Sequence, residues 1–488
     1  MVGVPGLKLK QSRLMTMALS ILILIGTGCA KTALPGPDSS VSEQLSLGEE
    51  KIFTQKQGAT RIVSQADAQE TAMLIFSRLA GYRPLFNDPK IVDMVAKLMA
   101  GQSIAAAKVA TDDPAFCNKT LRLVATKMSY RDENPTNPSN DFVATFVGAI
   151  CKEDIDARKL LTDNFYFQFD QAQLLTVPAA PAINRTNLTI AADADRLTKI
   201  LKSNLHYETM DVIPGGFDYR NLVRGPSGIL IRGPNDTVSL LPAEDASALI
   251  SSRGFMSAHA IAGTNRRLYE FINREFNCIA MEDFADTSRS DEFVARDVNK
   301  YDDKYNSQCK GCHTQMDAMK SAFAYFDFFD GGVGQQYTKH SGVYLGVNQV
   351  RLAPATAENA NQFKSSNNVP LDPINVSWKL NRNADFYGKS VIDNRWTNNI
   401  MGTTNRAYFG WNGAMTGKGV QALGVMISSS ERFPKCIAER AFTEVCKRKP
   451  GAADRPMIDW VAQQMKQNNY SVKTAYQSVA TQIECIGE

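Results

Sequence analysis

Cys309, Cys312 and His313 follow one another in the order C-x-x-C-H, within the stretch 308–319 (QCKGCHTQMDAM). Two thiols at this spacing can add across the two vinyl groups of haem, and the adjacent imidazole can ligate the iron. A zinc corner would need two further Cys or His ligands nearby, and a redox dithiol needs no following histidine. The nearest histidine is His340, and the chain has no second C-x-x-C. The pattern therefore predicts one covalently bound haem c, with His313 as the proximal iron ligand.

The second axial ligand is not identified by spacing. The two methionines inside the stretch follow the histidine too closely to reach the opposite face of the ring, so we expect them to pack beside it. Met415 lies in the glycine-bracketed segment WNGAMTGKGV and is the first choice, with Met401 and His340 as alternatives. Five aromatic residues after the motif are expected to pack around the porphyrin: Phe323, Tyr325, Phe326, Phe328 and Phe329.

The N-terminus has the pattern of an export signal. Basic residues are followed by an apolar stretch over 14–25, which is shorter than a transmembrane helix requires. The small residues before Cys29 resemble a bacterial lipobox, so residues 1–28 are expected to be a signal peptide and Cys29 a lipidated residue. The alternative is ordinary cleavage near Ala30. Residues 29–64, rich in Pro, Ser and Gly, are interpreted as a flexible tether. The expected location is the periplasmic face of the outer membrane, or the periplasm.

The charge balance argues against a nucleic-acid partner. The formal net charge is +4, and residues 1–28 contain three basic residues and no acidic residue, so the remainder carries +1. Nucleic-acid-binding domains usually carry a marked basic excess. The expected partners are instead a periplasmic redox protein and a membrane reached through the N-terminal lipid anchor.

Six cysteines remain when the lipidation candidate and the two C-x-x-C cysteines are set aside from the nine in the chain. An even number in an exported protein predicts three disulfides. Cys117 and Cys151 lie on two predicted helices joined by the loop RDENPTNPSN. Helices with such a connection should be antiparallel neighbours, which predicts the pair Cys117–Cys151.

The pairing of the other four follows from helix geometry. Cys436 and Cys446 lie on one predicted helix over 431–446, where ten residues span roughly 15 Å. A disulfide needs Cα atoms within roughly 7 Å, so these two cannot pair with each other. If the predicted C-terminal helices run up, down and up, the ends of the first and third meet. This favours Cys446–Cys485 and leaves Cys278–Cys436.

The apolar periodicity indicates a mainly α fold. The sequence suggests a helical N-terminal region, a mixed middle region, an α-helical cytochrome c-like haem region and a C-terminal helical bundle. The expected boundaries are 65–180 for the helical N-terminal domain, 181–300 for the mixed domain, 301–340 for the haem-binding segment, 341–390 for an inserted loop region, and 391–488 for a C-terminal helical domain that packs on the haem.

Residues 309–332 (CKGCHTQMDAMKSAFAYFDFFDGG) resemble the haem block of planctomycete-type cytochrome c domain proteins. These are exported multidomain proteins of unknown function with one such motif. Residues 252–278 are similar to the segment that precedes the haem in that family, and SSSERFPKC with the residues after it is similar to the family's C-terminal domain. The chain departs from the pattern where Ala318 replaces Pro and Lys320 stands near the expected Gly, which changes the expected turn after the motif.

Three functions are compatible with these features. The first is an exported c-type cytochrome lipoprotein that transfers one electron at a time in the cell envelope. The second is a haem-dependent periplasmic oxidoreductase, acting on a substrate or on peroxide. No catalytic residue can be named for it, since His206 and His259 are isolated. The third is a structural envelope lipoprotein. The sequence favours an electron carrier over a stand-alone enzyme.

Overall fold

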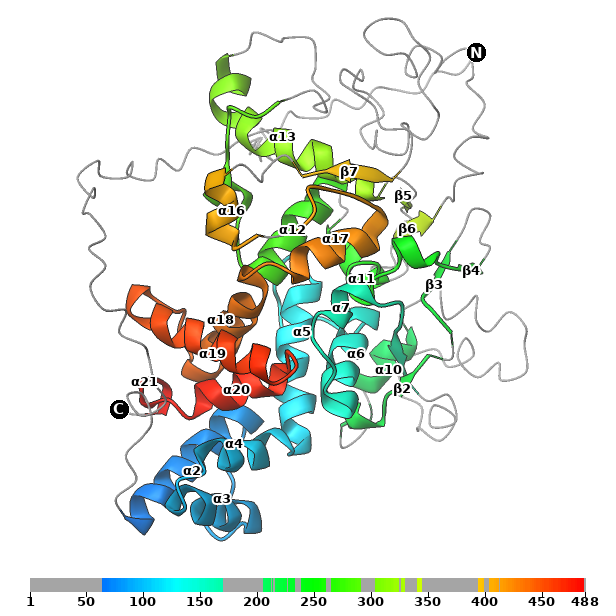
Figure 1. Ribbon diagram of the computed structural model, residues 1–488. Coiled ribbons are helices and arrows are strands. Elements are labelled where there is room, and N and C mark those ends of the chain that lie inside the picture. Colours follow the sequence, from blue (N-terminus) through cyan, green and yellow to red (C-terminus); the bar gives the residue numbers. More distant parts are fainter. Residues whose placement is uncertain are drawn as a thin grey trace, which may run out of the picture. The chain divides into compact units, whose positions relative to one another are not determined.

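In the computed structural model, helices make up most of the residues that the structure describes, and the strands among these residues are few and short (Figure 1). This agrees with the mainly α prediction. None of the helices in the described part of the chain is both long and apolar enough for a membrane span. The structure describes residues 64–169, 205–211, 213, 216–225, 227–232, 238–259, 265–290, 303–323, 326–329, 340–344, 394–398, 403–411 and 413–486.

The first three helices form a small antiparallel group whose starts are set by capping residues. They are α2 (Gln65–Ala80), α3 (Pro89–Met99) and α4 (Ser103–Thr111), and α2 packs on both others. The Ser64 side chain accepts a hydrogen bond from the backbone of Asp67 at 3.1 Å. The Asp88 side chain does the same for Lys90 at 2.9 Å, with Pro89 at the first helical position.

The next helical pair carries the first predicted disulfide. Cys117 and Cys151 are joined with their Cα atoms 6.1 Å apart, as the antiparallel arrangement predicted. Both lie on π-helical turns that continue into or out of α-helices. The elements are η1 (Phe116–Leu121), α5 (Arg122–Ser129), α6 (Asp141–Gly148) and η2 (Ala149–Glu153).

In the described residues of the middle of the chain, the strands form short antiparallel pairs. These elements are α7 (Lys159–Thr162), β1 (Phe167–Gln168), α10 (Leu205–Asp211), β2 (Val223–Arg224), β3 (Leu230–Arg232) and β4 (Val238–Leu240), where β1 pairs with β2 and β3 with β4. Side-chain contacts hold the region to the helices. For example, Arg122 Nη2 donates to Asp211 Oδ1 at 2.7 Å.

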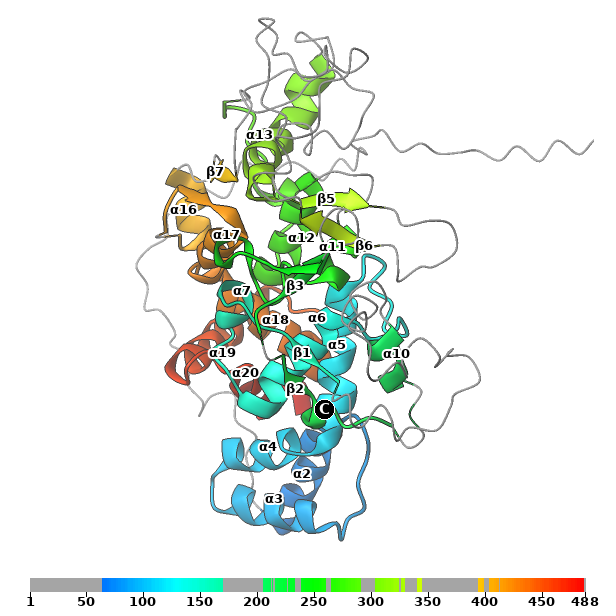
Figure 2. The same cartoon turned by 90° about the vertical axis from the view of Figure 1, so that its right-hand side faces the viewer.

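Helices α11 (Arg253–His259) and α12 (Asn265–Asn277) connect the middle region with the segment that carries the C-x-x-C-H motif. Two further strand pairs lie around them, and Figure 2 shows the pair β5–β6 beside α11 and α12. The elements are β5 (Phe326–Phe329), β6 (His340–Tyr344), β7 (Arg395–Thr397), α16 (Thr403–Phe409), β8 (Thr416–Lys418) and α17 (Gly419–Ser428).

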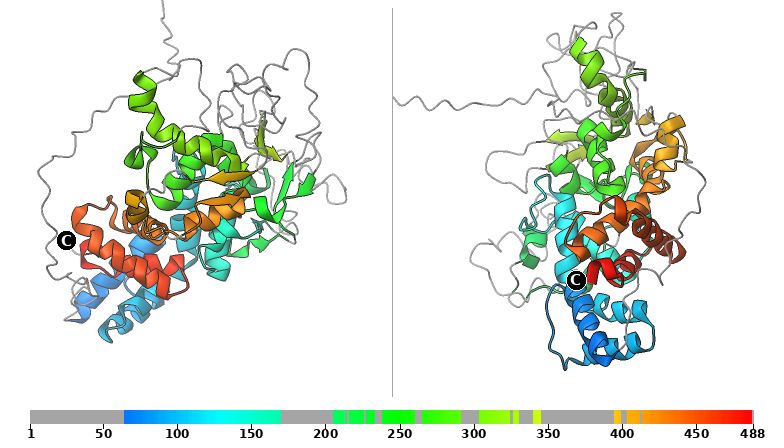
Figure 3. Two further views of the ribbon diagram at one scale, coloured as in Figure 1. Left: turned by 45° about the horizontal axis from the view of Figure 1, so that its top comes forward. Right: turned by 90° about the vertical axis from the view of Figure 1, so that its left-hand side faces the viewer.

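The C-terminal helices pack on one another and on the N-terminal group (Figure 3). They are α18 (Arg432–Cys446), α19 (Arg455–Gln467), α20 (Val472–Ala480) and α21 (Ile483–Ile486). Helix α20 contacts α4, and α18 contacts α2. The remaining predicted pairs are also joined: the Cα atoms of Cys446 and Cys485 are 4.4 Å apart and those of Cys278 and Cys436 are 5.1 Å apart.

Candidate functional site

The C-x-x-C-H motif lies at the start of a helix. A π-helical turn, η9 (Tyr305–Cys309), runs directly into α13 (Lys310–Met319), so Cys309 immediately precedes α13. Cys312 and His313 follow three and four residues later. Side chains at this spacing lie on one helix face, and all three are half-buried. The fold therefore presents two thiols and one imidazole together on a partly accessible surface.

Neighbouring backbone packs closely against the first turn of α13. The Gly311 carbonyl accepts a hydrogen bond from Asp286 N at 3.4 Å, and a Cβ at Gly311 would lie only 3.0 Å from the Ala285 Cβ. The Cys312 thiol donates to the Met281 carbonyl across 3.8 Å. Gly311 thus allows α13 to lie against residues 285 and 286 more closely than a residue with a side chain would. Helix α13 also packs on α12 and on β7 (Figure 1).

Asp317 is the centre of a buried polar cluster one turn after the motif. Its side chain has no exposed surface, and Oδ2 lies 3.2 Å from His313 Nδ1. Lys320 Nζ lies 2.9 Å from Oδ1, and Arg266 from α12 forms an ion pair with the same oxygen. Burial disfavours a charged carboxylate, but the two cations and the imidazole outweigh burial and hold the pKa of Asp317 well below its usual range.

This cluster determines which nitrogen of His313 can bind a metal. An ionised carboxylate can only accept hydrogen bonds, so the contact of Asp317 with His313 Nδ1 favours the tautomer that has its hydrogen on Nδ1. The Nε2 lone pair is then left for a metal ion. The same carboxylate is also the partner of Lys320, which is itself buried. Burial lowers the pKa of the Lys320 amine, and the charge of Asp317 opposes this effect without cancelling it.

The predicted second axial ligands are only partly described. Met415 is half-buried and immediately precedes β8, where its carbonyl accepts from Asn398 N at 2.7 Å. Because β8 pairs with β7 and β7 packs on α13, Met415 lies on the strand pair next to the motif helix. Met401 and Cys29 lie outside the described residues. His340 belongs to β6, but its side chain, like that of His206, lies outside the described part.

The aromatic run after the motif is partly placed. Phe323 and Phe326 are buried in the hydrophobic core, and their ring centroids are 6.3 Å apart in an edge-to-face arrangement. Tyr325 and the side chains of Phe328 and Phe329 lie outside the described residues. The two placed rings extend the core towards α13 and so lower the polarity of the surroundings of the motif.

His259 has the properties of a packed core residue. Its ring lies between Phe255 and Phe271, 4.0 Å from the latter, and Nε2 is 3.4 Å from the Met128 carbonyl. Burial lowers the pKa of His259 to about 3, so the ring stays neutral under ordinary conditions. Nothing in this environment suggests proton transfer to a substrate.

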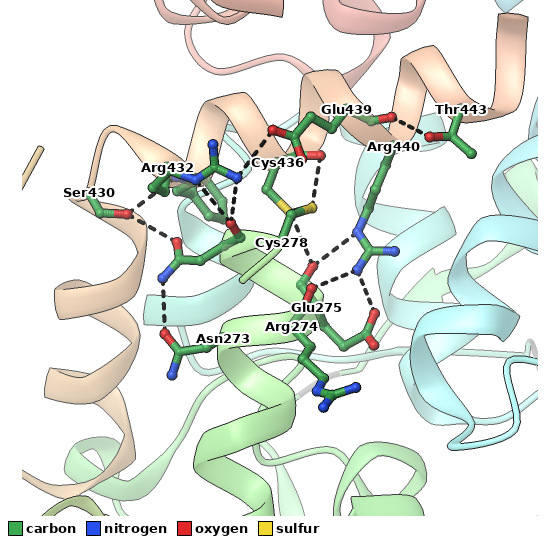
Figure 4. The surroundings of a disulfide bond; sticks show 12 residues. Asn273, Arg274, Glu275, Cys278, Ser430, Arg432, Cys436, Glu439, Arg440 and Thr443 are labelled. Atoms are coloured by element: carbon green, nitrogen blue, oxygen red, sulfur yellow. Dashed lines mark hydrogen bonds and ion pairs between the residues drawn. A yellow bond between two sulfur atoms is a disulfide. The ribbon is translucent and has the colours of Figure 1, made fainter. Parts of the chain in front are cut away.

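A second buried polar site lies at the join between α12 and α18. A cavity of about 20 Å³, enough for one water molecule, is lined mainly by apolar side chains together with Glu275, Arg440 and Tyr476. Arg440 Nη2 donates to Glu275 Oε2 at 2.7 Å. Figure 4 shows this pair beside the Cys278–Cys436 disulfide. The cavity is too small for an organic substrate.

The residues that sequence reasoning missed are Lys320 and Arg266 as partners of Asp317. A signal for part of this cluster was present, because Asp317 follows His313 by four residues and Lys320 follows Asp317 by three, both helix-face spacings. Among the residues that the structure describes, no three or more His, Cys, Asp or Glu side chains are grouped as a metal cluster. Comparisons with protein-family models, curated proteins and solved structures found no match to the chain.

Proposed function

We propose that this protein is an exported c-type cytochrome with one covalent haem, which transfers single electrons in the cell envelope. Cys309 and Cys312 would anchor the ring and His313 would ligate the iron through Nε2. The observation that carries the proposal is the arrangement at the start of α13, where two half-buried thiols and an imidazole share one helix face. Asp317 Oδ2 lies 3.2 Å from His313 Nδ1, and an ionised carboxylate there favours the tautomer that leaves Nε2 for the iron.

The cysteine inventory supports this assignment. The other six described cysteines are taken up in three disulfides, and Cys309 and Cys312 belong to none of them. Three disulfides are usual for an oxidising compartment, where haem attachment to C-x-x-C-H also takes place. A bound haem c would supply one-electron chemistry, with its potential set by the second axial ligand, by burial and by neighbouring charges.

The remaining parts of the proposal follow the sequence. Cys29 would carry the lipid that places the protein on the periplasmic face of the outer membrane, with a periplasmic protein as its redox partner. Met415 is the proposed sixth ligand because its strand pair adjoins α13, with Met401 and His340 as alternatives. The resemblance to planctomycete-type cytochrome c domain proteins is part of the same proposal.

The test is expression with a periplasmic haem-attachment system, followed by haem staining of a denaturing gel and a pyridine haemochrome spectrum. We expect covalent haem in the wild type and none in the double variant Cys309→Ser/Cys312→Ser. The double variant Cys117→Ser/Cys151→Ser is the matched control, because it also removes two cysteines yet leaves the motif intact. A wild-type protein that takes up no covalent haem would overturn the proposal.

A further inference from the structure

We propose that Asp317 is a positioning residue that sets the reduction potential of the haem iron, by accepting the Nδ1 hydrogen of His313. The inference rests on the proposed haem function and deepens it. It assigns a role to the buried cluster that follows the motif. It predicts that the haem iron has a lower reduction potential than it would have if His313 Nδ1 donated to a neutral acceptor.

The two oxygens of Asp317 have different partners. Oδ2 faces His313 Nδ1 at 3.2 Å, whereas Oδ1 faces Lys320 Nζ at 2.9 Å and also pairs with Arg266. The cations therefore hold the carboxylate from one side and leave the other oxygen for the imidazole. Since His313, Asp317 and Lys320 lie on one stretch of α13 and η10 (Lys320–Phe323), helix geometry fixes their relative positions.

A charged acceptor on Nδ1 changes the electronic character of the ligand. The carboxylate draws the Nδ1 hydrogen towards itself, which raises the electron density at Nε2 and stabilises Fe(III) relative to Fe(II). Complete burial of Asp317 strengthens the effect, because a hydrogen bond in a region of low dielectric is electrostatically stronger than one in water. Lys320 and Arg266 act in the opposite direction, but they lie on the far oxygen.

A purely structural reading is that Asp317 only neutralises Lys320 and Arg266. The two readings differ in what they predict for the potential. If Asp317 acted only through its charge, removing it together with Lys320 would leave the net charge near the iron and hence the potential unchanged. If it polarises His313, the same double removal should still raise the potential.

The experiment measures midpoint potentials by spectroelectrochemical titration of the purified, haem-containing full chain. Asp317→Asn keeps the shape but removes the charge. We expect its ferrous-to-ferric ratio at a fixed applied potential to rise by roughly tenfold, which for one electron equals a shift of 59 mV. Lys320→Met should shift the ratio the other way, because it removes a positive charge and leaves the His313–Asp317 hydrogen bond.

Asp113→Asn is the matched control: Asp113 is also buried and paired with a lysine, Lys90, but lies outside the site.

The double variant Asp317→Asn/Lys320→Met covers the case in which Asp317→Asn alone does not fold. It removes both buried charges together, so the loss of the charged acceptor should still raise the ferrous fraction, by less than the single variant. Covalent haem with an unchanged potential in the Asp317 variants would overturn this inference and leave the proposed function intact. A wild type without covalent haem would remove both, so the haemochrome spectrum is recorded first for every variant.

Discussion

Asp317 and Glu275 are two buried carboxylates whose pKa values are shifted in opposite directions. Asp317 has two cationic partners and an imidazole, and its pKa is held well below the usual range. Glu275 pairs with Arg440, whose guanidinium also donates to the Glu275 and Arg274 carbonyls at 3.1 and 3.2 Å. The charge of Arg274 also lowers the pKa of Glu275, and the charge of Glu133 raises it. Burial therefore prevails over the divided charge of Arg440 and raises the pKa of Glu275 to about 7. The number of cations committed to a carboxylate decides whether it stays ionised.

The difference fits the positions of the two groups. Asp317 lies on α13, one turn after the C-x-x-C-H motif, where a permanent charge can orient the imidazole of His313. Glu275 lies in the scaffold, next to the disulfide that joins α12's end to α18 (Figure 4).

Breaking the covalent support of the Glu275 region should have the largest effect. The Cys278–Cys436 disulfide spans 158 residues, and its removal by Cys278→Ser/Cys436→Ser should lower the free energy of unfolding by about 5 kcal/mol in the chain-entropy description. The Cys117–Cys151 bond spans only 34 residues, and its removal should cost about 4 kcal/mol. Denaturant unfolding without reductant measures both. A smaller loss for the longer span would contradict the expected order.

Neutral isosteres test the comparison directly at pH 7. Asp317→Asn removes the negative charge beside the buried Lys320 and should lower the free energy of unfolding by roughly 3–5 kcal/mol. Glu275→Gln should cost about 1 kcal/mol or less, because about half of the Glu275 side chains are already neutral at that pH. Adding Lys320→Met to Asp317→Asn should recover part of the loss. Equal costs for the two isosteres would show that the carboxylates are not held differently.

The pH dependence of stability should carry the signature of Glu275. Its pKa is raised from 4.5 to about 7 in the folded state, so the folded protein binds a proton that the unfolded chain releases. The resulting stabilisation is complete below about pH 4.5 and is lost as the pH rises to about 7, by roughly 1–3 kcal/mol. The measurement is the difference in unfolding free energy between wild type and Glu275→Gln across this range, in which the other titrating groups cancel. A difference that grows in favour of the wild type with rising pH would have the wrong sign.

The sequence predicted the local parts of both regions well. The C-terminal helix expected over 431–446 corresponds to α18 (Arg432–Cys446), because apolar periodicity is a property of neighbouring residues. The disulfide pairs joined in the structure are the three predicted ones. Helix rise excluded the pair Cys436–Cys446, and the expected order of the C-terminal helices then favoured Cys446–Cys485.

Contacts between distant segments were beyond this reasoning. The ion pair of Asp317 with Arg266 joins residues 51 apart, and that of Glu275 with Arg440 joins residues 165 apart. Such partners depend on how α12 packs on α13 and α18, which no local period encodes. The spacing of His313, Asp317 and Lys320 could have indicated these local contacts, but the Arg266 ion pair depends on the packing of α12.

Removal of an exposed charge next to Glu275 should have the smallest effect. Arg274 is 43% exposed and pairs with Glu270 Oε1 at 2.9 Å, one helical turn earlier. Arg274→Ala should cost only about 0.3–0.5 kcal/mol, since water already screens the pair, and the Arg274 carbonyl that Arg440 uses is retained. Thermal or denaturant unfolding at low and high salt measures this, with Glu270→Ala as the matched variant, and both losses should shrink at high salt. A larger loss that persists at high salt would mean that the charge of Arg274, which with Arg440 lowers the pKa of Glu275, adds measurably to the free energy of unfolding.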